Sequence, residues 1–267
     1  MTFSEIVTSG EGFPEVGIVS LVHGDDPYGS RVIGELSQTT KLERGTLHTI
    51  YANLPASFKR KRQIDFDLNQ AFPGREHGLL EHRAARNLRE ILDTCAFVLD
   101  IHTSNQEHAP YVLIPTTETT AKVAPSYAHS DLSILDRKRI DLDHLGTIAA
   151  STGISRRVVL PSALSQGSSL VDYVNAHGKG YGILLQVGSF QGKSATEIAL
   201  DALRSFLATY GLQEGVPQRA ERPEVYLGRE FTAEKQDTTP IAAGEHTTFY
   251  CPAFQEQRPF LRVQRIS

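Results

Sequence analysis

The stretch VGIVSLVHGDDPYG, residues 16–29, is an apolar run that ends in a histidine, a glycine and two aspartates. Valine, isoleucine and leucine dominate its first seven residues, which is typical of a strand that is buried on both faces. The pair Asp26-Pro27 that follows is typical of the first residues of a helix. The stretch therefore predicts a buried strand with polar side chains directly after it.

Five further runs along the chain have the same apolar character. Two stretches between them, residues 77–95 and 193–211, repeat apolar side chains every three or four residues and place charges elsewhere, as amphipathic helices do. Strands that alternate with helices predict an α/β fold with a mainly parallel sheet and helices on both faces. The five further predicted strands are 46–52, 95–101, 111–115, 156–161 and 182–188.

The pattern changes after about residue 214. Residues 214–231 are polar and contain prolines, and residues 247–267 are rich in β-branched and aromatic side chains without a helical period. We therefore expect a main domain over residues 1–213 and a small β-rich C-terminal domain over residues 214–267.

Composition and charge argue against several classes of protein. The 267 residues carry a formal net charge of −4, and the basic run Lys59–Arg62 is typical of a solvated face or of a rim that attracts anions. No segment reaches the roughly 18 apolar residues of a membrane span, and the N-terminal residues lack the pattern of a signal peptide. The only two cysteines, Cys95 and Cys251, fit a reducing compartment. We expect a cytoplasmic protein that binds neither nucleic acid nor membranes, and the sequence carries no signal for its oligomeric state.

Two histidines follow predicted strands directly: His23 follows the first, and His102 follows the strand 95–101. Because ligands bind at the carboxyl ends of the strands in such sheets, both can face one cleft. Asp26 adds a carboxylate, and two histidines with one carboxylate are a common ligand set of catalytic zinc. A histidine that only forms a hydrogen bond, and an aspartate that only begins a helix, are alternative interpretations.

The polar stretch RKRQIDFDLNQAFPG, residues 60–74, has neither a helical nor a strand period. It groups Arg62, Asp65, Asp67 and Asn69 in one loop. Such loops often carry binding residues, although ordinary Asx turns have the same composition. Both interpretations are open at this point.

Five motifs, taken in the order in which they occur along the chain, resemble one known family, the aspartoacylase/succinylglutamate desuccinylase family of zinc amide hydrolases. The resemblance extends over roughly residues 16–210 and implies a zinc carboxypeptidase-like fold for the main domain, a Zn²⁺ cofactor and a small-molecule substrate. The motifs are HGDDPYG (23–29), ANLPA (52–56), RQIDFDLNQAFPG (62–74), LDIHTS (99–104) and GILLQVGSFQG (182–192).

Position by position, the resemblance implies that His23, Asp26 and His102 bind the zinc ion. Asp26 stands where the family usually has glutamate, so the carboxylate is kept on an arm that is one methylene shorter. Asn53 and Arg62 match residues that bind the substrate and polarise its carbonyl group.

The same resemblance assigns Asp67 and Asn69 to the loop that shapes the substrate pocket. The next residue of that loop is usually an arginine that binds a substrate carboxylate, but here it is Gln70, whose amide carries no charge. Gln70 is kept among the expected substrate-binding residues. Arg60 and Arg75 are the candidates to supply the missing positive charge.

The general base of the family, a glutamate, is replaced in this chain by Gln186. Glutamine can donate a hydrogen bond to water or accept one, but it cannot take a proton. Losing a positioned acid–base group typically costs about 10²–10⁴ in rate. Glu107 and His108 are candidates for a relocated base, although both also fit an exposed loop, and Asp25 is a candidate to orient a histidine ring.

We therefore interpret the chain as a zinc-dependent amide hydrolase, a deacylase that acts on an N-acyl amino acid or a similar small molecule, with Arg62 stabilising the oxyanion. The alternative is a catalytically impaired or repurposed relative that binds a small ligand or partner through the same cleft, because Gln186, Gln70 and Asp26 depart from the family together. An unrelated α/β enzyme with structural histidines is the third interpretation.

Overall fold

The structure is a computed structural model that describes most of the chain. Glu107, a candidate for the relocated base, lies outside the described residues. The described residues are 2–104, 108–116, 142–161, 164, 169–177, 179–189, 193–218, 223–233, 244–251, 253, 257–258 and 260–266.

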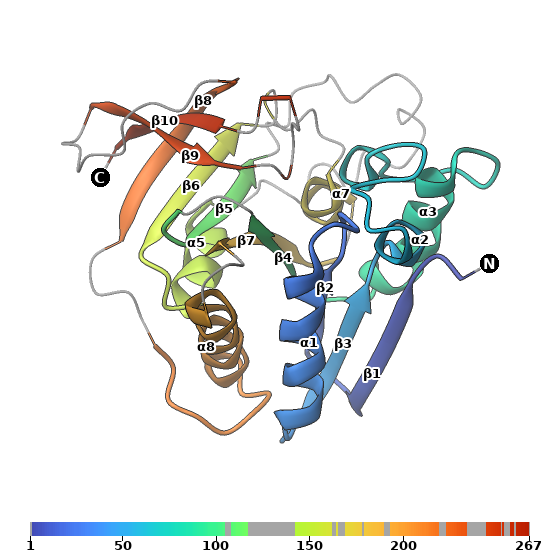
Figure 1. Ribbon diagram of the computed structural model, residues 1–267. Helices are drawn as coiled ribbons and strands as arrows, with labels where there is room; N and C mark the ends of the chain where they lie inside the picture. The colour runs from blue at the N-terminus through green and yellow to red at the C-terminus, as the bar shows by residue number, and fades with distance from the viewer. Residues whose placement is uncertain are drawn as a thin grey trace.

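One ten-stranded sheet runs through the described part of the chain, in the order β1-β3-β2-β4-β7-β5-β6-β8-β10-β9 (Figure 1). The pairs β2–β3, β2–β4 and β4–β7 at its centre are parallel, and so are β5–β6 and β6–β8. The strands are β1 (Glu5–Glu11), β2 (Glu15–Ser20), β3 (Gly45–Tyr51), β4 (Phe97–Ser104), β5 (Tyr111–Thr116), β6 (Arg156–Pro161), β7 (Tyr181–Ser189), β8 (Glu224–Thr232), β9 (His246–Tyr250) and β10 (Phe260–Arg265).

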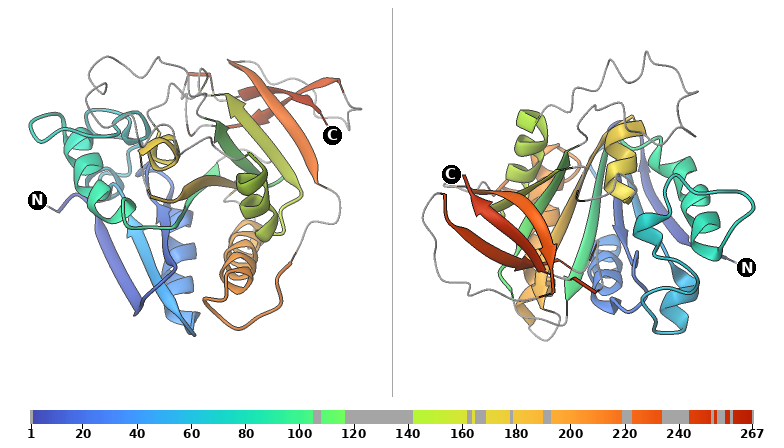
Figure 2. Two further views of the ribbon diagram at one scale, coloured as in Figure 1. Left: turned by 180° about the vertical axis from the view of Figure 1, so that it is seen from behind. Right: turned by 90° about the horizontal axis from the view of Figure 1, so that it is seen from above.

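Helices cover both faces of this sheet, as the sequence predicts (Figure 2). One core lies under α1, α5 and α8, and the opposite core lies under α3 and α7; each contains aliphatic side chains from the helices and from alternate strand positions. The helices are α1 (Pro27–Thr39), α2 (Leu54–Phe58), the short 3₁₀ helix η1 (Leu68–Gln70), α3 (Leu80–Leu92), α5 (Leu142–Ser151), α7 (Leu170–His177) and α8 (Lys193–Thr209).

All six predicted strands and both predicted helices are confirmed to within a few residues. The C-terminal strands β8 and β10 add to the same sheet, because β8 pairs with β6 and β10 with β8. The division into two domains at residue 214 therefore stays a prediction. Strand β1 was not predicted, since most of its side chains are exposed and it has no apolar run. Among the described residues, no helix has the length and apolar character that a membrane crossing requires.

The loop after β2 is packed tightly against α2. A Cβ atom added to Gly24 would lie 2.2 Å from the carbonyl carbon of Ala56 and 2.3 Å from the amide nitrogen of Ser57. Gly24 also donates its N–H to the carbonyl of Arg62 at 3.0 Å. Gly24 therefore allows the loop after β2 to approach the segment that follows α2.

We expect Gly24→Ala to lower the free energy of unfolding by about 1–3 kcal/mol or more, because the methyl group would meet backbone atoms. Gly146→Ala is the matched control: it lies in α5 with no atom within 4 Å of the added Cβ, so it should stabilise by about 0.5–1 kcal/mol. Urea unfolding of both variants measures the two effects. A Gly24→Ala variant as stable as the wild type would contradict this packing.

Candidate functional site

Two buried histidines lie side by side at the carboxyl ends of β2 and β4. His23 is 3% exposed and His102 is 2% exposed. Their ring centroids are 5.3 Å apart, and the ring planes are inclined by 57°. Because β2 and β4 are parallel neighbours in the sheet, their ends meet at one edge. The two histidines that the sequence singles out are therefore in contact.

Each of these rings is held by a carboxylate at its Nε2 atom. His23 Nε2 lies 3.0 Å from Asp67 Oδ1, and His102 Nε2 lies 2.9 Å from Asp100 Oδ2. No described residue forms a hydrogen bond with Nδ1 of either ring. Metal-binding histidines are usually oriented in this way, with one nitrogen on a carboxylate and the other on the ion.

Three ionisable side chains of the site, His23, His102 and Asp67, have pKa values that are shifted from their usual values. Burial lowers the pKa of His23, and the Arg62 charge lowers it further. Burial would also lower the pKa of His102, but the Asp100 carboxylate outweighs it and raises that pKa above its usual value. Burial would raise the pKa of Asp67, yet His23 and Arg62 hold it well below its usual range. Asp67 is therefore ionised at neutral pH.

Asp26 uses its carboxylate to join α1 to β4. Its side chain caps α1, with Oδ1 accepting from the N–H of Gly29 at 3.4 Å and from the hydroxyl of Thr103. Oδ2 accepts from the N–H of Thr103 at 2.7 Å. The helix-start interpretation of Asp26 is thus realised, and its role as a ligand stays a prediction.

The side chains at this edge of the sheet fit a metal ion in part. The two histidines fit one, because they are buried, adjacent and oriented by carboxylates. Within the described ranges, however, no three His, Cys, Asp or Glu side chains are grouped around one point. The residues therefore fit a zinc ion at two of the three predicted positions, with the Asp26 carboxylate adjoining His102 through Thr103.

Arg62 is joined to the histidine pair through Asp67. Its Nη2 donates to Asp67 Oδ2 at 2.8 Å, and the other oxygen of the same carboxylate binds His23. The Arg62 side chain is 10% exposed. The loop 60–74 thus brings a guanidinium group to the histidine pair, and Asp67 also forms a turn by accepting from the N–H of Asn69 at 2.9 Å. A role of this loop in substrate binding stays a prediction.

The two predicted asparagines are buried and hydrogen-bonded within the protein. Asn53 caps α2 by accepting from the N–H of Ala56 at 3.3 Å and donates to Glu81 at 3.4 Å. Asn69 accepts from the N–H of Leu170 at 3.0 Å and donates to the carbonyl of Ala253 at 2.9 Å. Both side chains therefore join distant segments of the chain to one another, and a direct contact with substrate stays a prediction.

Gln186 lies beside His102, because the two residues are partners in the parallel pair β4–β7. It is 0% exposed, and neither its Oε1 nor its Nε2 has a hydrogen-bond partner among the described residues. A buried amide without partners is costly, so this position calls for an explanation.

The remaining candidates are exposed or partly exposed. Gln70 is partly exposed at the end of η1, and Asp25, Arg60 and Arg75 are exposed. His108 packs on the rings of Tyr111 and Tyr250, with centroid distances of 5.8 and 6.1 Å, and burial lowers its pKa. None of the contacts that the structure shows for these residues reaches His23 or His102.

The segment after β9 reaches the same site, which the sequence did not predict. The hydroxyl of Tyr111 donates to the carbonyl of Tyr250 at 2.7 Å, and Ala253 accepts from Asn69. Burial raises the pKa of Cys251 to about 11, although the nearby Tyr111 hydroxyl and the charge of Arg62 lower it. No sequence pattern announces this contact, because Asn69 and Ala253 are 184 residues apart.

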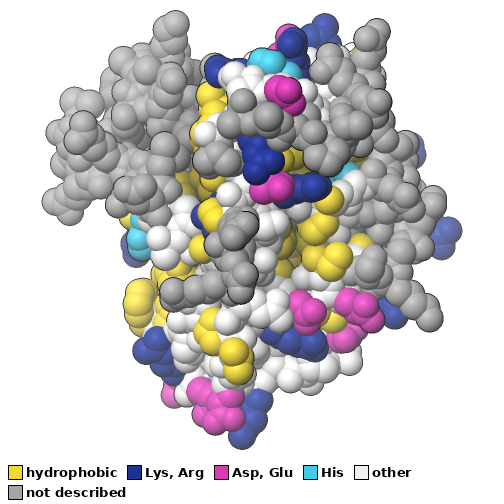
Figure 3. Space-filling model, turned by 90° about the vertical axis from the view of Figure 1, so that its left-hand side faces the viewer, with side chains coloured by type: hydrophobic (Ala, Val, Ile, Leu, Met, Phe, Trp, Pro, Cys, Tyr) yellow, Lys and Arg dark blue, Asp and Glu magenta, His cyan; other side chains and the backbone are white. Residues whose placement is uncertain are grey.

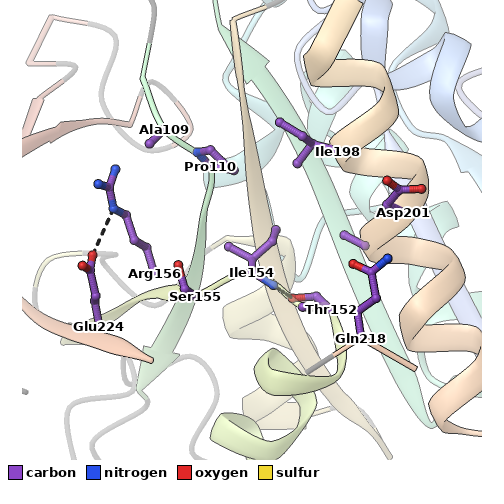
Figure 4. A pocket seen from close by; sticks show the side chains of 12 residues that line it. Ala109, Pro110, Thr152, Ile154, Ser155, Arg156, Ile198, Asp201, Gln218 and Glu224 are labelled. Carbon is purple, nitrogen blue, oxygen red and sulfur yellow. Dashed lines mark hydrogen bonds and ion pairs between the residues drawn. The ribbon is translucent and has the colours of Figure 1, made fainter. Parts of the chain in front are cut away.

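A separate pocket of about 430 Å³ lies between α8, the segment before β6 and the start of β8 (Figure 4). Arg156 on its wall pairs with Glu224, Nε to Oε2 at 3.1 Å, and Asp201 stands across the pocket on α8. None of the predicted site residues lines it.

Elsewhere on the surface, Lys and Arg side chains lie next to Asp and Glu side chains on the face in Figure 3, so that face shows no basic area among the described residues.

One family model matches part of the chain. Residues 13–138 match the model of the succinylglutamate desuccinylase/aspartoacylase catalytic domain. No curated protein matches the chain. The matched segment carries His23, Asp26, Arg62, Asp67 and His102, whereas Gln186 lies beyond it.

Several solved structures have the same fold. A succinylglutamate desuccinylase/aspartoacylase from Rhodobacter sphaeroides is 20% identical with a TM-score of 0.66, over 98% of this chain and 80% of that one. The product-bound ectoine utilization protein EutE (DoeB) from Ruegeria pomeroyi is 19% identical with a TM-score of 0.68, over 98% and 81%. The succinylglutamate desuccinylase from Chromobacterium violaceum is 17% identical with a TM-score of 0.65, over 98% and 88%. The predicted fold class is confirmed.

Proposed function

We propose, from the match of residues 13–138 to the model of the succinylglutamate desuccinylase/aspartoacylase catalytic domain, that the chain is a zinc-dependent amide hydrolase. The substrate class is an N-acyl amino acid or a similar small molecule. One observation carries the proposal: Asp67 joins the guanidinium of Arg62 to the ring of His23, and His102 lies against that ring.

The residues that would hold the ion are His23 and His102, with Asp26 as the third. When bound there, zinc supplies a Lewis acid and lowers the pKa of a water molecule to about 7. Asp67 and Asp100 keep the proton of each ring on Nε2, so that the Nδ1 lone pairs are available. The carboxylates thus fix both the tautomer and the orientation of the two rings.

Arg62 would stabilise the charge that develops on the carbonyl oxygen during attack. Asp67 holds the guanidinium in place, so that little reorganisation is needed when the charge appears. Gln186, beside His102, would form hydrogen bonds with the attacking water or with the substrate amide. Because its carboxamide cannot take a proton, we propose that the wild-type chain is a slow hydrolase.

The same proposal extends to the location of the protein. Cys95 and Cys251 are both free and buried. Unpaired cysteines suit a reducing compartment, which supports a cytoplasmic location.

Arg62→Ala is expected to lower kcat by about 10²–10³-fold, which is the usual loss when one donor to an oxyanion is removed. The measurement is the release of free amine from a series of N-acetyl and N-succinyl amino acids by the zinc-loaded chain. Arg44→Ala is the matched control and should leave kcat unchanged, because Arg44 is exposed, lies directly before the start of β3 and donates to the carbonyls of Tyr210 and Gly211. If no member of the series is hydrolysed, or if Arg62→Ala matches the wild type, the proposal is wrong.

A further inference from the structure

The carboxylate of Glu81 is buried in the protein without a cationic partner. Glu81 is the second residue of α3 and is 0% exposed. Among the described residues, no lysine, arginine or histidine forms an ion pair with it. A buried charge is costly unless hydrogen bonds compensate for the lost water. The hydrogen bonds that Glu81 accepts therefore indicate its role in the protein.

Amide N–H groups occupy both oxygens of this carboxylate. Oε1 accepts from the backbone N–H of Ile64 at 2.6 Å and from the side chain of Asn53 at 3.4 Å. Oε2 accepts from the backbone N–H groups of Asp65 and Phe66 at 3.1 and 3.0 Å. Three successive backbone donors thus converge on one side chain.

The contact between this loop and α3 is reciprocal. The side chain of Asp65 accepts from the backbone N–H of Leu80, at the N-terminus of α3, at 3.1 Å. The loop therefore holds the first turn of the helix while Glu81, in that turn, holds the loop. Neither Glu81 nor Asp65 contacts the histidine pair itself.

Residues 64–66 lie directly between Arg62 and Asp67, the two residues that meet at the site. The hydrogen bonds to Glu81 fix the middle of this six-residue loop. They therefore also restrict the positions of Arg62 and Asp67 at its two ends. Asn53, the fourth donor to Glu81, begins α2, whose residue Ala56 packs against Gly24 in the loop after His23. Glu81 thus connects the two loops that build the site.

We propose that Glu81 is a positioning residue: it anchors residues 62–67 so that Arg62 and Asp67 reach His23. This inference rests on the proposed function for its effect on rate. Only an acceptor without protons suits three converging N–H groups, because a carboxamide would turn its own N–H donors toward them. Aspartate keeps the charge but is one methylene shorter.

Glu81→Gln is expected to lower kcat by about 10–100-fold with little change in KM, because a displaced guanidinium loses its effect mainly in the transition state. Glu81→Asp should recover part of this loss. Leu203→Ala is the control, since Leu203 is buried in the opposite core, on α8; it should destabilise the fold while leaving kcat unchanged. An equal loss of kcat in Leu203→Ala would overturn the proposal.

Amide hydrogen exchange, measured by NMR, tests the anchor without any substrate. In the wild type the amides of residues 64–66 should be protected, and Glu81→Gln should remove this protection while Leu203→Ala keeps it. Unprotected amides in the wild type would overturn the proposal even if the variants fail to fold. A wild type that hydrolyses no N-acyl amino acid would instead count against the proposed function, and the exchange rates would still decide on the anchor.

Discussion

Gln186→Glu is expected to raise kcat for the hydrolysis of an N-acyl amino acid by about 10²–10⁴-fold, the usual contribution of a positioned acid–base group. Position 186 is the register partner of His102 on the neighbouring strand, and the side chain is completely buried. Glutamate has nearly the same shape as glutamine. The substitution therefore adds a proton acceptor beside the histidine pair without adding volume.

The lack of hydrogen-bond partners around Gln186 explains why the substitution is expected to raise kcat. Its Oε1 and Nε2 have no partner among the residues that the structure describes, so the wild-type side chain has no internal hydrogen bonds to lose. Burial would raise the pKa of a glutamate at the same place above its usual value. A cation bound by the histidines would favour its ionised form.

Two outcomes separate the possible causes of a slow reaction. Gln186→Leu is the matched control, because leucine fills a similar volume and offers no proton acceptor; it should not raise kcat. If Gln186→Glu also brings no gain, the missing base is not what limits the reaction. The pocket itself would then differ from that of a hydrolase, and the repurposed relative would become the better interpretation.

His102→Ala is expected to abolish zinc binding together with hydrolysis. Removing an outer partner of a metal ligand typically lowers affinity or activity by about 10–100-fold, and removing the ligand itself should cost more. His102 contributes one of two rings that meet at 5.3 Å. Without it, the described residues offer His23 and the already hydrogen-bonded Asp26 alone.

Two further variants calibrate this result. Asp100→Asn keeps the ring of His102 but weakens its orientation, so it should give an intermediate loss of zinc. His48→Ala removes another buried histidine, which contacts Thr8 at 2.9 Å and Glu15 at 3.4 Å. It pairs with Gly17 near the start of β2, whereas His23 follows the end of that strand. This variant should bind zinc like the wild type. Equal zinc loss in all three would show that folding, and not ligation, is being measured.

The sheet could be predicted because its central strands are continuous aliphatic runs. β2, β4 and β7 bury both faces, so their sequences lack the alternation of a half-exposed strand. The meeting of His23 and His102 followed from the same reasoning, since parallel neighbours end at one edge. β1 escaped prediction because it is an exposed edge strand with the sequence EIVTSGE.

The supporting contacts of the site could not be predicted. The helical pattern of residues 77–95 places charged residues on the solvent side, yet the structure buries Glu81 completely. Its partners are backbone N–H groups, which leave no trace in a pattern of side chains. Asn69 likewise binds the backbone of Leu170 and Ala253. Such contacts depend on how distant segments pack, and a single sequence does not encode that in its spacing.

Asp26 shows how two interpretations of one residue can compete. Aspartate is among the best residues for capping a helix, and the structure uses Asp26 in this way for α1. A carboxylate with hydrogen bonds to Thr103 and Gly29 can still bind a cation, because each oxygen has two lone pairs. Capping therefore limits where the carboxylate can point and leaves ligation as a prediction.

The measurement that tests the central claim most directly is the metal content of the purified chain after exposure to zinc and removal of the excess, with His102→Ala and His48→Ala treated alike. Elemental mass spectrometry should find about one zinc per chain in the wild type and in His48→Ala, and almost none in His102→Ala. A wild type without zinc, or a His102→Ala variant that retains it, would contradict the assignment of the histidine pair as a zinc site.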